Sequence, residues 1–192
     1  RKWRAANVAL FDHLRADPSS RVQVLAADLY LGKDDTLLGP TPDDIVARAA
    51  RLAPDDAFVQ WTAARDGNYW SNSCGPAVRP EAAVANLLRL EPDNAAVWTY
   101  AVALASLAGD QDSVDSALSR MASAKHADDH LIEHWHAWRD VFAANPDLRD
   151  PSMGFEHVPA ERRAEVAAYF KADGGTGSAA RVMRAACSTD AG

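Results

Sequence analysis

The sequence has few of the features that define a disulfide scaffold or a membrane protein. It contains only two cysteines, Cys74 and Cys187, which are too few for a disulfide framework. No run of 18 apolar residues is present, which excludes a membrane-spanning helix within this sequence. Glycine and proline number ten each, and they fall between periodic segments rather than inside them. Glycine and proline therefore do not interrupt the periodic segments.

A concentrated positive charge is also missing. The chain has 27 acidic and 20 basic residues, for a formal net charge of −7, and its basic residues are scattered. Binding to a phosphate backbone requires a basic stripe, so we expect no nucleic-acid partner. Because the chain begins with Arg1, we expect a fragment from which an upstream signal could have been removed, and the localisation stays open.

Hydrophobic residues make up 48% of the chain, and they recur at helical spacing. One example begins at 41–44, where Thr-Pro-Asp-Asp supplies a cap, a first-turn proline and two carboxylates near the positive end of a helix. Ile45, Ala49 and Leu52 follow at the expected intervals. No stretch alternates with the period of a strand. The sequence therefore predicts an all-α fold.

One junction between helices occurs twice. Residues 51–57 read Arg-Leu-Ala-Pro-Asp-Asp-Ala, and residues 89–95 read Arg-Leu-Glu-Pro-Asp-Asn-Ala. Each copy lies between two short periodic segments, so the repeating unit is a helical hairpin. An ordinary up-down bundle would explain the periodicity but not the repeated junction.

The segment from Pro92 to Met121 resembles one tetratricopeptide (TPR) unit. It has an aromatic residue, Trp98, early in its first helix, and Gly109-Asp110 stands at the turn. The resemblance implies a short TPR-like solenoid of stacked antiparallel hairpins that forms a single domain over residues 1–192, with Trp98 in the core. The expected repeats are 18–54, 55–92, 93–126 and 127–172, with capping segments at 1–17 and 173–192.

In TPR-like proteins the first helix of each hairpin lines a concave groove that holds a peptide. The resemblance therefore implies a non-catalytic scaffold that binds a protein or peptide partner and needs no cofactor. The candidate groove residues all lie on expected first helices: Trp61, Arg65, Tyr69, Thr99, Ala103, His130 and Glu133. Aromatic and arginine side chains are common interface anchors. Packing of Trp61 against a neighbouring repeat would suit the same position.

A different function is suggested by the histidines His126, His130 and His134, which follow one another at four-residue spacing. On one helix they would form a stripe that could hold zinc, nickel or copper. The segment 130–134 also matches H-x-x-E-H, a pattern of metal-dependent peptidases in which Glu133 would activate water. No third ligand for that motif is identifiable. A metal-binding protein or metal-dependent hydrolase is therefore the alternative to the scaffold.

Overall fold

The computed structural model describes residues 2–28, 40–65, 80–148, 162–165 and 167–168. Within these ranges the chain is mostly helical and contains no strand, which confirms the all-α prediction. The named helices are α1 (Lys2–Ala16), α2 (Ser20–Gln23) continued by the 3₁₀ helix η1 (Val24–Asp28), α3 (Pro42–Leu52), α4 (Ala57–Arg65), α5 (Glu81–Leu90), α6 (Ala95–Ala108), α7 (Gln111–Ser123), α8 (Leu131–Ala144) and the 3₁₀ helix η2 (Pro146–Leu148). None of them is long and apolar enough to cross a membrane.

Local signals set the ends of several helices. Thr41 and Asp44 form a capping box at the start of α3, as the sequence predicts, and Pro42 occupies the first turn. Asn94 caps α6 by accepting a hydrogen bond from the backbone of Ala96. Gly109 ends α6 with φ of 70°, a left-handed conformation that glycine adopts without steric penalty.

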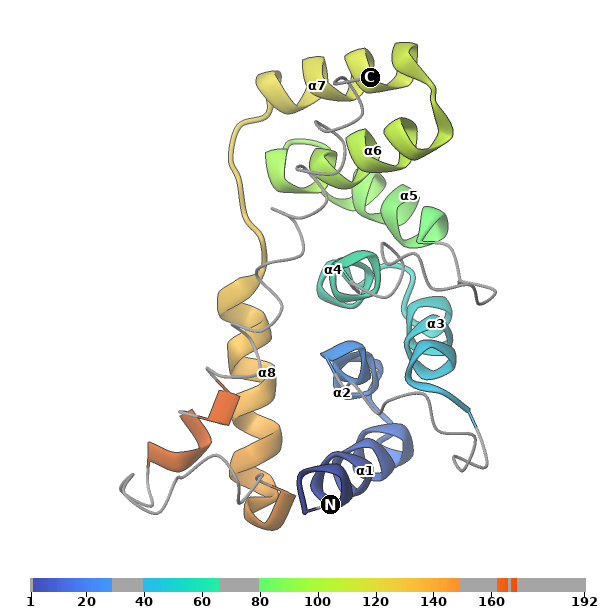
Figure 1. Ribbon diagram of the computed structural model, residues 1–192. Helices are drawn as coiled ribbons and strands as arrows, with labels where there is room; N and C mark the ends of the chain where they lie inside the picture. The colour runs from blue at the N-terminus through green and yellow to red at the C-terminus, as the bar shows by residue number, and fades with distance from the viewer. Residues whose placement is uncertain (1, 29–39, 66–79, 149–161, 166, 169–192) are drawn as a thin grey trace.

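Helices α1 to α7 follow one another along the molecule (Figure 1). The α2–η1 segment packs on α3, α4 on α5, and α6 on α7, while α3 with α4 and α5 with α6 join successive pairs. The buried core runs through this arrangement. Its largest fully buried side chains include Leu14, Leu25, Ile45, Phe58, Leu87 and Trp138.

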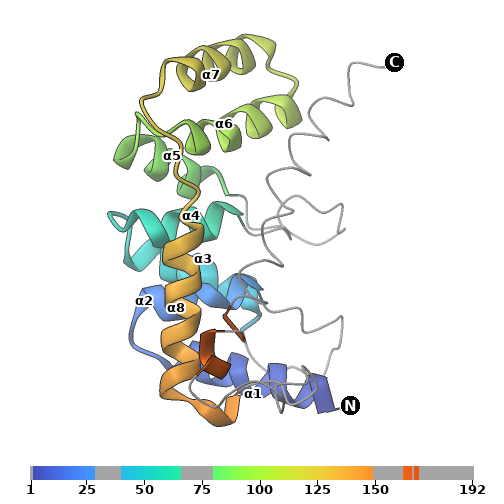
Figure 2. The same cartoon turned by 90° about the vertical axis from the view of Figure 1, so that its left-hand side faces the viewer.

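Helix α8 does not continue this succession as a fourth stacked hairpin over 127–172 would. Residues 124–130 connect α7 to α8, and α8 runs back beside the earlier helices, where it contacts α2 and α4 (Figures 1 and 2). Asn145, just after α8, lies 3.2 Å from the His13 ring of α1. The first helices of the first two expected repeats, α2 and α4, are therefore covered by a segment of the same chain.

The connection at 124–130 is fixed to the turn between α5 and α6. The backbone of Lys125 donates to the carbonyl of Asp93, and His126 accepts from the backbone of Ala95. The buried Asn94 side chain accepts from the Asp128 backbone and donates to the Asp128 carbonyl. These bonds direct the extended chain back along the molecule, whereas the sequence pattern around His126 predicts the start of another stacked hairpin.

The predicted core position of Trp98 is corrected by the structure. Its side chain is only half-buried, because the indole lies beside the preceding turn and donates to the Pro92 carbonyl at 2.8 Å. Trp138 of α8 is instead fully buried and stacks on Phe142 with ring centroids 5.4 Å apart.

Candidate functional site

The most unusual group in the described chain is the buried carboxylate of Asp28, at the end of η1. Its Oδ1 accepts a hydrogen bond from Arg65 of α4 at 2.6 Å. Its Oδ2 lies 2.6 Å from His134 Nε2 and accepts from Trp138 Nε1 at 2.6 Å, both on α8. Side chains from η1, α4 and α8 therefore meet at one carboxyl group.

The environment of Asp28 keeps it ionised. Burial by itself raises the pKa of a carboxyl group. The neighbouring Arg65 and His134, together with the hydrogen bonds from His134 and Trp138, outweigh burial and hold the pKa of Asp28 well below its usual range. The site thus contains a permanent negative charge and the Arg65 cation, both almost fully removed from water.

The ionised Asp28 also determines which nitrogen of His134 carries hydrogen. Nε2 faces Asp28 Oδ2, which is an acceptor only, so Nε2 must donate. The guanidinium of Arg65 lies 2.8 Å from the same nitrogen and cannot donate to it as well. Arg65 of α4 therefore donates to Oδ1 of Asp28, and His134 and Trp138 of α8 both donate to Oδ2.

Around this carboxylate, three buried nitrogens have no hydrogen-bond partner among the described residues. They are Trp61 Nε1, Arg65 Nε and His134 Nδ1. The three side chains touch, since the Arg65 guanidinium lies 4.8 Å from the Trp61 ring centroid and the rings of Trp61 and His134 are 5.8 Å apart. An unsatisfied buried donor or acceptor costs about 1–3 kcal/mol. The contact between α4 and α8 is therefore incompletely satisfied.

A second polar group holds the start of α8. His130, with φ of 52°, precedes the first helical residue, and its ring lies 3.0 Å from Glu91 and 3.2 Å from Glu133. Its partial burial lowers the pKa of the imidazole, but the hydrogen bonds to Glu91 and Glu133 overcome this, and the pKa is raised above its ordinary value. The His130 ring also packs on Trp61, with centroids 5.7 Å apart.

The outer edge of the contact is an exposed ion-pair network. Arg21 of α2 binds Asp56 through two nitrogens at 2.6 and 3.0 Å, and it binds Glu133 of α8 at 2.5 Å. Its guanidinium also lies 5.4 Å from the Phe58 ring centroid. The pair Arg21–Glu133 thus joins α8 to α2 at the rim, while Asp28 joins η1, α4 and α8 at the centre.

The predicted groove residues divide into three groups. Trp61, Arg65, Ala103 and His130 are buried, Thr99 and Glu133 are partly exposed, and Tyr69 lies outside the described residues. The structure brings Trp61, Arg65, His130 and Glu133 together, but His130 and Glu133 belong to the covering segment rather than to the surface that it covers. Thr99 and Ala103 lie on α6.

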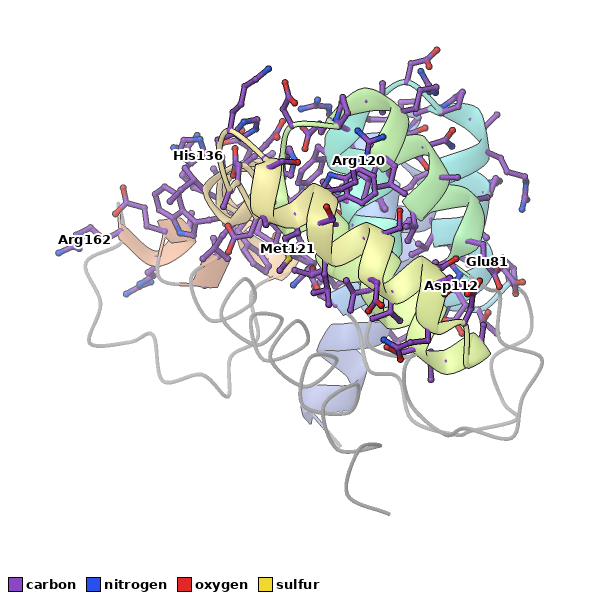
Figure 3. All side chains as sticks on the ribbon, turned by 90° about the horizontal axis from the view of Figure 1, so that it is seen from above. Glu81, Asp112, Arg120, Met121, His136 and Arg162 are labelled. Atoms are coloured by element: carbon purple, nitrogen blue, oxygen red, sulfur yellow. The ribbon has the colours of Figure 1, made fainter. Side chains whose placement is uncertain are left out.

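The histidine stripe of the metal hypothesis is not formed. His126 lies in the extended connection and His130 has a left-handed backbone, so only His134 lies within a helix. His134 is buried against Asp28, whereas the neighbouring His136 is exposed on the outer side of α8 (Figure 3). In the described ranges, no group of three His, Cys, Asp or Glu side chains could hold a metal ion. Both cysteines lie outside these ranges.

Three important residues of the site are not singled out by the sequence pattern: Asp28, Glu91 and Trp138. A weak signal exists for Asp28, because it follows Val24 and Leu25 by one helical turn and is thus an acidic residue on an apolar face. No family model, curated protein or solved structure matches the chain.

Proposed function

We propose that this protein is a non-catalytic scaffold, built as a short TPR-like solenoid, that binds a helical segment of a partner protein. The proposed binding surface is made by α2, η1 and α4, and is called here the α2–α4 surface. In the free chain α8 covers it. The observation that carries the proposal is that this surface already holds a helix, through an aromatic ring, a cation and a carboxylate.

The chemistry of the α2–α4 surface suits helix recognition. Trp61 and Arg65 project from α4 toward the covering helix α8. Phe58, which also lies on α4, has its ring centroid 6.0 Å from that of His134 on α8. Tryptophan and arginine are enriched among residues that dominate binding energies. A helix laid in a groove is a common mode of peptide recognition.

The experiment that tests this function should loosen α8 without touching the proposed surface. Glu133→Arg places a cation beside Arg21 and His130, so it should repel both and favour departure of α8. The matched control is Asp140→Arg, the same charge reversal at an exposed position of α8 whose partner is the adjacent Arg139.

Both variants and the natural chain would be used to capture partners from an extract of the source organism. A captured protein would then be purified and titrated by calorimetry. We expect Glu133→Arg to bind it more tightly than the natural chain, and Asp140→Arg to bind it equally. Equal affinities for all three chains would refute binding at the α2–α4 surface.

A further inference from the structure

The two oxygens of Asp28 have different kinds of partner. Oδ1 binds Arg65, and both residues belong to the α2–α4 surface itself. Within the described part of the chain, the donors to Oδ2 both come from α8 and are His134 Nε2 and Trp138 Nε1. The carboxylate is thus half satisfied by its own scaffold and half by the helix that covers it.

This division means that the surface stays electrically balanced without α8. The Asp28–Arg65 pair joins η1 to α4 and includes no atom of α8, so departure of the helix leaves the ion pair intact and exposes Oδ2 to water. Water can replace the two lost donors. By contrast, removal of either member of the pair would leave an uncompensated buried charge.

The polar part of the contact with α8 is incompletely satisfied. Trp61 Nε1, Arg65 Nε and His134 Nδ1 are buried at this contact without hydrogen-bond partners among the described residues, and departure of α8 would return them to water. The helix begins at Leu131 without a side-chain cap from His130. Its connection at 124–130 is fixed to the α5–α6 turn, so α8 would stay attached to the molecule if it left the surface.

From these observations we infer that α8 is an exchangeable occupant of the α2–α4 surface and that it displays the chemistry of the partner. The inference rests on the proposed function and specifies its ligand. The partner segment is a helix with two N–H donors one turn apart, directed at Asp28 Oδ2, and a carboxylate immediately before the first donor, directed at Arg21. In α8 these positions are Glu133, His134 and Trp138.

The spacing of the three positions follows from helix geometry. Residues four apart lie on one face and stack along it, so His134 and Trp138 reach the same oxygen. Glu133 lies about 100° around the helix from His134, toward Arg21 at the rim. Histidine, tryptophan, lysine or arginine can supply the donors, and aspartate can replace glutamate.

The probe is a fluorescent synthetic peptide of residues 130–146, titrated into the full chain. Three chains are compared: the natural protein, Trp138→Phe, which removes an α8 donor to Asp28, and Trp135→Phe. The control alters the same residue type on the same helix, where the indole instead contacts the Glu165 carbonyl at 3.3 Å. Loss of the Trp138 donor raises the fraction of chains with an open surface, and apparent affinity for the peptide rises with that fraction.

We expect the peptide to bind the Trp138→Phe chain at least about tenfold more tightly than the natural or Trp135→Phe chain. On the Trp138→Phe chain, a peptide that itself carries Trp138→Phe should bind about fivefold or more weakly than the unaltered peptide. Equal binding of the peptide to the three chains would overturn the inference. A dimer of the natural chain that the peptide dissociates would identify a second copy as the occupant and overturn the assignment to another protein.

Hydrogen exchange of the natural protein tests the same idea without any substitution. Amides of α8 should exchange through an opening that leaves α4 protected. Exchange of α8 only together with α4, in global unfolding, would overturn the exchangeable role. If α8 exchanged only with α4 but Glu133→Arg still increased the affinity for a captured partner, the proposed function would survive with a different ligand chemistry. If the peptide bound as expected but Glu133→Arg changed the affinity of no captured partner, the proposed function alone would be refuted.

Discussion

The replacement of Asp28 by asparagine is the most severe test of the buried site. The substitution keeps the size of the side chain but removes its charge, and it leaves the Arg65 cation, of which 5% is exposed, without a counter-ion. Breaking a buried ion pair in this way costs about 3–5 kcal/mol. The asparagine amide must also face donors from Arg65, His134 or Trp138, so at least one hydrogen bond is lost.

This loss is large compared with the total stability of a domain, which is typically about 5–15 kcal/mol. Urea unfolding followed by far-ultraviolet circular dichroism would measure it. The matched control is Asp140→Asn, where the carboxylate is 68% exposed and pairs only with Arg139; we expect a change of about 0.5 kcal/mol or less there.

A compensating pair separates the missing charge from any loss of shape. Asp28→Asn combined with Arg65→Met removes both charges, and the asparagine oxygen can still accept from His134 and Trp138, so no uncompensated buried charge remains. The double variant should therefore be more stable than Asp28→Asn by at least about 1 kcal/mol. An Asp28→Asn protein that unfolds at the same urea concentration as the natural protein would refute the assignment of a buried, paired charge.

Three further predictions concern neighbouring features. Trp98→Ala should lower the free energy of unfolding by only about 1–2 kcal/mol, because the ring is half-buried and its one hydrogen bond goes to Pro92. A larger fall in stability, measured by urea unfolding, would contradict that placement. Asn94→Ala should cost about 1–3 kcal/mol and speed amide exchange in α8, because it removes the α6 cap and the contact with Asp128; unchanged exchange would show that this contact does not fix the connection. The pKa of His130 is raised in the folded protein. The protonated ring therefore stabilises the fold fully at pH values below the pKa of the unfolded chain, about 6.5, and this stabilisation is lost as the pH rises through the pKa of the folded protein. Stability measured from pH 6 to 9 should show this loss in the natural protein and not in His130→Gln.

The helices could be predicted from the sequence because their signals are local. The cap at Thr41 and the glycine stop at Gly109 depend on residues within a few positions of the helix end, and both were found as predicted. The repeated junction at 51–57 and 89–95 indicates how α3 joins α4 and how α5 joins α6. These features need no knowledge of distant contacts.

The return of α8 could not be predicted in this way. Its contacts with Asp28 join residues separated by 106 and 110 positions, and no local pattern encodes which surface a helix covers. Trp61 and Arg65 lie on α4, in a segment that the sequence predicts to be helical, and the sequence left open whether Trp61 faces a partner or packs inside the protein. They are buried because α8 lies over them, so the position was predictable and the exposure was not.

The polar contact between α8 and Asp28 has a physical consequence that an apolar contact would lack: it fixes the register of the helix. If α8 moved by one turn in one direction, Phe142 would replace Trp138 opposite Asp28, and Oδ2 would lose a donor because phenylalanine has none. If it moved by one turn in the other direction, His130 would replace His134, but His130 lies before the helix with a left-handed backbone and would have to join it. Either shift would also separate Glu133 from Arg21.

A buried carboxylate contributes little net stability when it is paired, but it penalises every misplaced partner by the cost of an unsatisfied charge. Asp28 therefore favours the observed register of α8 through the positions of the donors His134 and Trp138.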